Sequence, residues 1–168
     1  QFVHIQLMLV CWLWLATESG IASRLTPRTV LLLFAFGLVP VLMTPVDYFM
    51  YDIASAEHLI AMTWLMKFGG GLEAQPISHV VLFNLVNSLR GPASPSPKRS
   101  ALFSSMILFC VGGIIGFMIE GRNVTVPAHY HGSIVAVTLA YMGVTYHLLP
   151  LLGFRRPTGR LVILQPWI

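Results

Sequence analysis

Two histidines stand two positions apart at the start of an apolar stretch that is long enough to span a bilayer. His129 and His131 lie in VPAHYHGSIVAVTLAYMGVTYHLLP, residues 126–150. Two positions in a helix correspond to about 200° of rotation, so the two imidazoles leave the helix on nearly opposite sides. They cannot chelate one ion together, as histidines four residues apart would. Two interpretations follow: hydrated histidines at a membrane interface, or two ligands for two separate cofactors.

The residues around this pair favour a flat, iron-containing cofactor on each side of the helix. Neutral imidazole is an axial ligand of haem iron. Gly132 and Ser133 follow the pair directly, and a macrocycle approaches a helix closely only where the side chains are small. Tyr130 lies at about 100°, in the arc between the histidines, on a short path for electrons between the two irons. The spacing therefore allows two haems.

The elements that position these residues belong to a membrane protein. The chain is 56% hydrophobic and 10% charged, whereas a soluble domain has about 25% charged residues. The third apolar segment contains FGGGLEAQP, in which three glycines and Pro76 predict a kink. We predict an all-α, polytopic bundle of about five transmembrane helices in a single membrane-embedded domain, 1–168. The expected spans are 2–17, 28–46, 57–90, 100–119 and 128–150, and a sixth begins near Leu161.

The basic residues predict an orientation in the membrane. By the positive-inside rule, their end of the bundle is cytoplasmic in a bacterial-type inner membrane, and the histidine pair lies near the periplasmic face. Topology accounts for the net charge of +4, so no nucleic-acid partner is expected. On the predicted basic side are Arg24, Arg28, Arg90, Lys98, Arg99, Arg155, Arg156 and Arg160; Arg122 is on the other side, with Asp47, Asp52, Glu57 and Glu120.

The stretch LFCVGGIIGFMIEGRNVTVPAHYHGSIVAVTLAYMGVTYHLLPLLGF, 108–154, resembles helices nine and ten of the catalytic subunit of haem-copper oxidases. In that family a V-G-G-x-x-G helix is followed by a loop and an A-H-[FY]-H motif. The resemblance implies that His129 holds a high-spin haem, that His131 holds a low-spin haem, and that Tyr130 bridges them. Gly112 and Gly116 form a small-x-x-x-small pair suited to close helix contact.

The rest of the chain resembles the family more loosely. Residues 68–86 resemble helix eight, and QFVHIQLMLVCWLWLA resembles helix six, so the chain would be an internal piece covering about helices six to ten. The chain begins at Gln1 and stops within an apolar run, which favours the same interpretation. Gly132 would allow close approach of a haem.

The sequence departs from the family at the second metal. The family's copper has an adjacent His-His pair between helices seven and eight, and LMTPVDYFMYDIASAEHLIAMTW contains no such pair. His58 and Asp47 are the candidates for this metal instead. Carboxylates suit iron better than copper, and the nitric oxide reductase branch uses iron with an acidic ligand. Copper and non-haem iron therefore both stay open.

Glu73 is expensive inside a bilayer, where ionisable side chains usually face a bundle interior or a water path. One interpretation gives it a place on a proton route. The other places it where a kinked helix meets helices outside this chain.

The resemblance implies a respiratory oxidoreductase that passes electrons from a low-spin to a high-spin haem and reduces dioxygen to water. The implied partners are other respiratory-complex subunits, cytochrome c or quinol as electron donor, and the lipid bilayer. Two alternatives stay open. One is a nitric oxide reductase with a non-haem iron, and the other is a divergent or non-catalytic membrane subunit.

Overall fold

The computed structural model describes residues 1–21, 25–88, 96–121 and 123–168, and these residues form helices and no strand. The all-α prediction is therefore confirmed. Because α3, the π-helical segment η1 and α4 follow one another without a break, they form one continuous helical rod. The helices are α1 (Phe2–Glu18), α2 (Pro27–Met50), α3 (Ala56–Trp64), η1 (Leu65–Gly69), α4 (Gly70–Ser88), α5 (Pro97–Phe117), α6 (Thr125–Leu151), α7 (Arg160–Leu164) and the 3₁₀ turn η2 (Gln165–Trp167).

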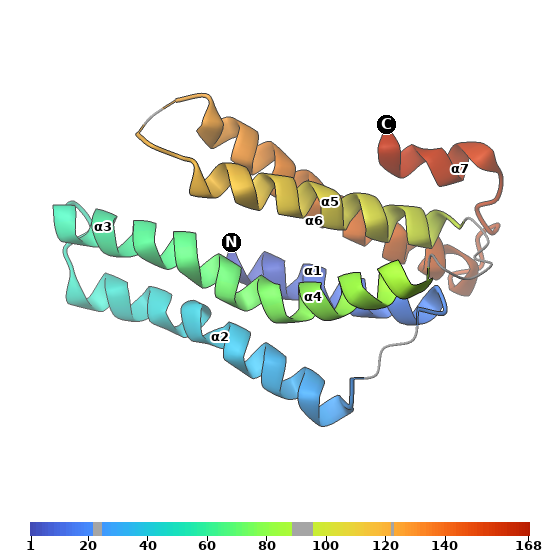
Figure 1. The fold of residues 1–168 in the computed structure, drawn as a ribbon, viewed down its shortest axis with the longest axis horizontal. Coiled ribbons are helices and arrows are strands. Elements are labelled where there is room, and N and C mark those ends of the chain that lie inside the picture. The colour runs from blue at the N-terminus through green and yellow to red at the C-terminus, as the bar shows by residue number, and fades with distance from the viewer. Residues whose placement is uncertain (22–24, 89–95, 122) are drawn as a thin grey trace.

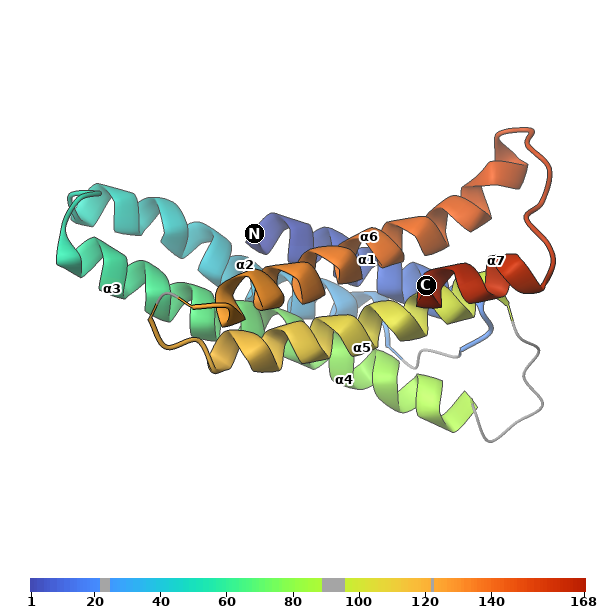
Figure 2. The same ribbon diagram turned by 90° about the horizontal axis from the view of Figure 1, so that it is seen from above.

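Successive long elements run in alternating directions along the bundle (Figures 1 and 2). Helices α5 and α6 form the most closely associated pair, and α1 contacts α2, α4, α5 and α6. Helix α1 therefore lies at the centre of the bundle, while α2 lies at its edge against α1, α3, η1 and α4.

The starts of two long helices follow from their sequences. Helix α2 begins with Thr26-Pro27, and the Thr26 hydroxyl accepts a hydrogen bond from the Thr29 amide at 3.2 Å. Helix α5 begins in the same way with Ser96-Pro97, and Ser96 accepts from the Arg99 amide at 3.2 Å. A hydroxyl cap followed by proline satisfies a free amide and presets the first helical dihedral.

Among the described residues, three helices are long and apolar enough to cross a membrane: α2, α5 and α6. Judged by the length and composition of these helices, the predicted count of about five spans was too high. Helix α1 is apolar but has only 17 residues, and the third predicted span is divided into α3, η1 and α4. The segment near Leu161 forms the five-residue α7 and the turn η2, and the sixth span expected to begin there stays a prediction.

The irregularity expected around Pro76 lies a little earlier in the chain. Leu65–Gly69 form a π-helical turn, and α4 then continues through Pro76. A π turn and a proline are alternative ways to disturb the helical hydrogen-bond ladder. Gly69 lies at the end of this turn, where an added Cβ would be 2.8 Å from the Pro40 side chain of α2.

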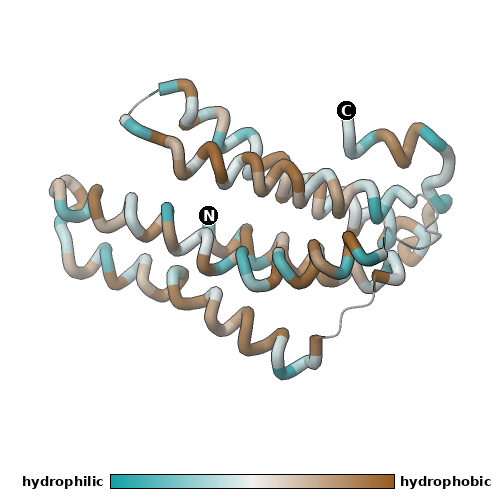
Figure 3. The backbone as a smooth tube through the Cα atoms, viewed as in Figure 1, coloured by the Kyte–Doolittle hydropathy of each residue, from teal (hydrophilic) through white to brown (hydrophobic). Residues whose placement is uncertain are grey.

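Basic residues are concentrated at one end of the bundle, where Glu18 pairs with Lys98 at 3.2 Å. The start of α2, the start of α5 and the α6–α7 connection lie at one end (Figure 1), and they carry Arg28, Lys98, Arg99, Arg155, Arg156 and Arg160. The α2–α3 and α5–α6 connections lie at the other end, with Asp52 and Glu120. Apolar residues fill most of the length between these ends (Figure 3). Arg24, Arg90 and Arg122 lie outside the described residues.

A buried chain of hydrogen bonds joins the three central helices. Trp12 of α1 donates through Nε1 to the Ser105 hydroxyl of α5 at 2.8 Å, and Ser105 donates to the Ala136 carbonyl of α6 at 2.6 Å. Ser105 is fully buried, and Trp12 is 1% exposed. Since an unpaired polar group in an apolar interior is costly, this pairing fixes the mutual register of α1, α5 and α6.

We predict that Ser105→Ala lowers the free energy of unfolding by about 1 to 2 kcal/mol, because the Trp12 indole N–H loses its acceptor. Ser104→Ala is the matched control, since the buried Ser104 hydroxyl bonds only to Ser100 and Ala101 carbonyls of its own helix. Reversible unfolding of the protein in detergent measures both variants. Equal losses would contradict the cross-helix role of Ser105.

Candidate functional site

The candidate site is built on the contact between α5 and α6. A Cβ added to Gly132 would lie 2.9 Å from the Gly112 Cα, and one added to Gly112 would lie 2.8 Å from the Ser133 amide nitrogen. The two backbones therefore touch at this point, and only glycine fits on either side. This confirms the predicted close helix contact at Gly112. It also shows that Gly132 faces α5; the predicted close approach of a haem there stays a prediction.

His129 lies half-buried against α5. Its Nδ1 is 2.7 Å from the Gly112 carbonyl oxygen, and a Cβ on Gly116 would lie 2.6 Å from the same nitrogen. Gly112 and Gly116 together thus form the surface on which the imidazole lies. The carbonyl can only accept a hydrogen bond, so Nδ1 carries the proton and Nε2 of the neutral ring keeps its lone pair.

His131 lies on the other side of α6. It is exposed, and its Nδ1 donates to the Pro127 carbonyl of its own helix at 2.8 Å. The expected opposition of the two imidazoles is therefore confirmed. Tyr130 is 45% exposed, and its ring centroid lies 5.3 Å from that of His129. Tyr130 therefore lies beside the His129 imidazole in the structure.

Both histidines thus present Nε2 as the free ring nitrogen. A metal-binding histidine typically donates its other ring N–H to a carbonyl or carboxylate, which fixes the ring and its tautomer. His79 of α4 makes a similar bond to the Gln75 carbonyl at 2.7 Å, so this bond alone does not identify a ligand. What distinguishes His129 and His131 is their opposed directions on one helix, combined with the glycine surface beneath His129.

The candidates for a second metal lie together but away from this pair. His58 Nδ1 and Asp47 Oδ2 are 3.5 Å apart, and both side chains are 9% exposed. The Tyr48 ring lies 4.8 Å from the His58 ring. In the part of the chain that the structure describes, no group of three His, Cys, Asp or Glu residues could hold a metal ion. The structure therefore brings two predicted ligands together and supplies no third.

Side chains of the π-helical segment η1 contact the end of α5. The Phe68 ring lies 5.9 Å from the Phe117 ring, and Lys67 Nζ lies 5.9 Å from the centre of the same ring. Phe117 is the neighbour of Gly116, on which His129 lies. His58 is ten residues before Phe68, about 15 Å of helix rise, so the Asp47–His58 pair is displaced toward the acidic end.

Sequence reasoning missed this contact and the backbone carbonyl that anchors His129. The run of glycines, Gly112, Gly113 and Gly116, was a signal for helix contact, but it did not tell which carbonyl the imidazole would reach. No local pattern links Phe68 to Phe117, because their contact depends on how two separate helices pack.

Glu73 lies on α4, 1% exposed, on the side that meets α1 and α2. Five residues after Phe68 it has turned by about 140°, so it does not face α5 as Phe68 does. The structure therefore does not bring Glu73 together with His129.

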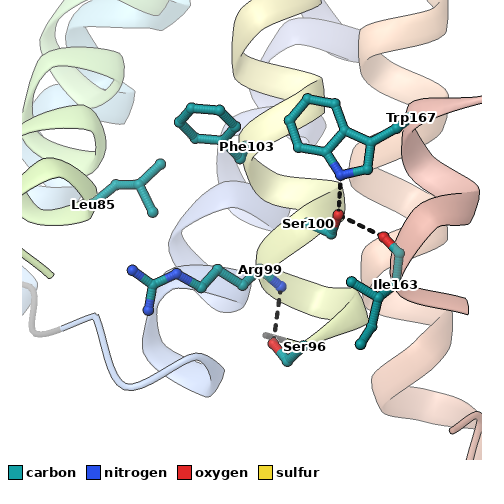
Figure 4. A pocket seen from close by; sticks show the side chains of 7 residues that line it. All are labelled: Leu85, Ser96, Arg99, Ser100, Phe103, Ile163 and Trp167. Carbon is teal, nitrogen blue, oxygen red and sulfur yellow. Dashed lines mark hydrogen bonds between the residues drawn. The ribbon is translucent and has the colours of Figure 1, made fainter. Parts of the chain in front are cut away.

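A hollow at the basic end lies apart from the histidine pair (Figure 4). Ser100 accepts a hydrogen bond from the Trp167 indole and donates to the Ile163 carbonyl at 2.7 Å. Ser100 is 16 residues before Gly116 on α5, about 24 Å of helix rise, so this hollow is not part of the candidate site. It is lined by Leu85, Ser96, Arg99, Ser100, Phe103, Ile163 and Trp167.

Comparison with known proteins gives two relatives. The chain is 28% identical over 164 residues to an uncharacterized protein of Aquifex aeolicus (strain VF5), covering 95% of this chain and 38% of the relative. It is 25% identical over 179 aligned positions to an uncharacterized protein of Rickettsia prowazekii (strain Madrid E), covering 90% and 35%. The chain thus spans less than two fifths of the length of these curated relatives. No family model and no solved structure matches the chain.

We predict that Gly112→Ala lowers the free energy of unfolding by about 1 to 3 kcal/mol, because the new methyl group would meet the α6 backbone. Gly113→Ala is the control on the same helix, since a Cβ there has no atom within 4 Å. It should be neutral or stabilising by roughly 0.5 to 1 kcal/mol, because alanine favours the helix. Thermal unfolding in detergent compares the two, and similar stabilities would contradict backbone contact at Gly112.

Proposed function

We propose that this chain is the haem-holding part of a membrane oxidoreductase of the haem-copper oxidase type. His129 is the axial ligand of a high-spin haem and His131 that of a low-spin haem. The proposed reaction is the reduction of dioxygen to water. The proposal places the protein in a bacterial-type inner membrane, with the basic end cytoplasmic and the histidine pair toward the periplasm.

The observation that supports this proposal is the geometry of the two imidazoles. Each has its Nδ1 proton engaged by a backbone carbonyl, at 2.7 Å for His129 and 2.8 Å for His131. Each therefore offers Nε2 as a ligand, on opposite sides of one helix. A high-spin haem needs one such nitrogen, so His129 fits it alone. A low-spin haem needs two axial ligands, so His131 would supply one and the proposal places the other outside this chain.

Haem bound at these positions would supply a one-electron carrier on the His131 side and a centre for a diatomic ligand on the His129 side. The chain's own contribution is orientation. Gly112 holds the His129 ring by its carbonyl, Gly116 leaves room for that ring, and Pro127 holds the His131 ring. Tyr130, whose ring lies 5.3 Å from that of His129, is the proposed bridge. Cytochrome c or quinol and further respiratory subunits are the proposed partners.

The second metal is a weaker fit to this chain. Asp47 and His58 offer one carboxylate and one imidazole, and copper or non-haem iron needs further ligands. We therefore propose no step that passes through this metal. The carboxylate beside His58 is the observation that favours the second candidate function, reduction of nitric oxide with a non-haem iron.

We predict that His131→Ala in the complete protein removes the low-spin haem absorption and leaves the high-spin signal, while His129→Ala removes the high-spin haem and its binding of carbon monoxide. The reason is that each substitution removes one axial nitrogen. Optical and electron paramagnetic resonance spectra of the purified variants measure both effects.

His79→Ala is the matched control, because His79 also bonds a carbonyl through Nδ1 but is assigned no ligand role. It should keep both haem signals. Retention of both signals in all three variants, or a protein without haem, would overturn the proposal and favour a non-catalytic membrane subunit. Elemental analysis then separates the two reactions: copper beside haem supports dioxygen reduction, and one additional iron without copper supports nitric oxide reduction.

A further inference from the structure

Glu73 is distinct among the acidic residues of this chain. The chain has six carboxyl side chains, of which Glu18, Asp52, Glu57 and Glu120 are exposed and Asp47 pairs with His58. Glu73 is 1% exposed, and neither of its carboxyl oxygens has a hydrogen-bond partner among the described residues. It is thus the one acidic side chain of the six that is buried without an ion pair.

A second polar side chain ends at the same place. The Gln6 amide nitrogen of α1 is buried and also has no hydrogen-bond partner among the described residues. A Cβ on Gly37 of α2 would overlap this Gln6 nitrogen and lie 3.2 Å from the Glu73 Cγ. Three helices therefore contribute to one polar point inside the bundle, and the glycine of α2 makes room for both side chains.

The other ionisable groups on the packed elements are engaged or directed elsewhere. His4 of α1 is exposed, and His79 of α4 is exposed and bonds to the Gln75 carbonyl. Lys67 lies over the Phe117 ring. No ion pair among the described residues includes Glu73.

An ionised carboxylate at such a point would be very costly, because Glu73 is buried and none of the described residues forms an ion pair with it. A protonated carboxyl group avoids this cost and becomes both a donor and an acceptor. The Gln6 amide carries an N–H donor and an oxygen acceptor, so it complements both halves of a carboxylic acid, directly or through water.

We propose that Glu73 and Gln6 form an internal proton-binding site, at which Glu73 holds a proton taken from the aqueous phase and Gln6 is its hydrogen-bonding partner. Binding converts a carboxylate and a proton into a neutral carboxylic acid, and release reverses this. The existence of the site does not depend on the haem assignment. Its use as a proton source for the reduction rests on the proposed function.

The test is infrared spectroscopy of the complete protein in lipid vesicles at neutral pH. We expect the C=O stretching band of a protonated carboxyl group, which exchange into deuterated water shifts slowly because the site is buried. Glu73→Gln should remove this band, and Glu120→Gln, which alters an exposed carboxyl, should leave it unchanged. A band of equal intensity in wild type and Glu73→Gln, or no such band in wild type, would overturn the proposal.

Two further variants test the partner and do not change Glu73. Gln6→Ala should shift the band without removing it, because the acid loses its hydrogen-bonding partner. Gly37→Ala should do the same by displacing the Gln6 amide. An unchanged band in both variants would overturn the pairing even if Glu73→Gln failed to fold. Because the band is read without any haem signal, its presence or absence is distinguishable from failure of the haem assignment.

Discussion

The contact between the α5 and α6 backbones at Gly112 and Gly132 is the constraint on which the candidate site depends. Only at such close approach does the Gly112 carbonyl come within 2.7 Å of the His129 imidazole. With His129 directed at α5, helical geometry turns His131 away from it. One pair of glycines therefore determines the direction of both rings. Two cofactors held by these rings would lie on opposite sides of α6.

Helix packing also determines which buried polar groups have a hydrogen-bond partner. Around Ser105 every such group has a partner, because Trp12 donates to the hydroxyl and the hydroxyl donates to Ala136. Around Glu73, neither the carboxyl oxygens nor the Gln6 amide nitrogen has a hydrogen-bond partner among the described residues. In a medium without water this difference matters more than the number of contacts, since an unsatisfied group costs several kcal/mol, about as much as one well-packed side chain contributes. The hydrogen bonds at Ser105 hold the helices together, whereas the unpaired polar groups at Glu73 favour a chemical role.

Local patterns were sufficient to predict the helices, the opposition of His129 and His131, and the helix contact at Gly112, because these depend on helical periodicity and on side-chain size. The number of spans was overestimated, since α1 has only 17 residues and the third apolar segment forms α3, η1 and α4 in place of one long apolar α-helix. Contacts between distant helices could not be predicted. Trp12 and Ser105 are 93 positions apart, and the carbonyl that anchors His129 is chosen by how α5 and α6 cross. The ligand roles of these histidines stay predictions.

The π turn places the two proposed sites on opposite sides of one rod. Phe68, within the turn, meets Phe117 beside the Gly116 surface of His129, whereas Glu73, about 7.5 Å further along the rod, faces α1 and α2. An extra residue in a helical turn rotates every later side chain on that helix relative to the earlier ones. The turn at Leu65–Gly69 thus sets which face of α4 carries the buried carboxyl group, and it separates that carboxyl from the imidazole that the proposed reaction needs.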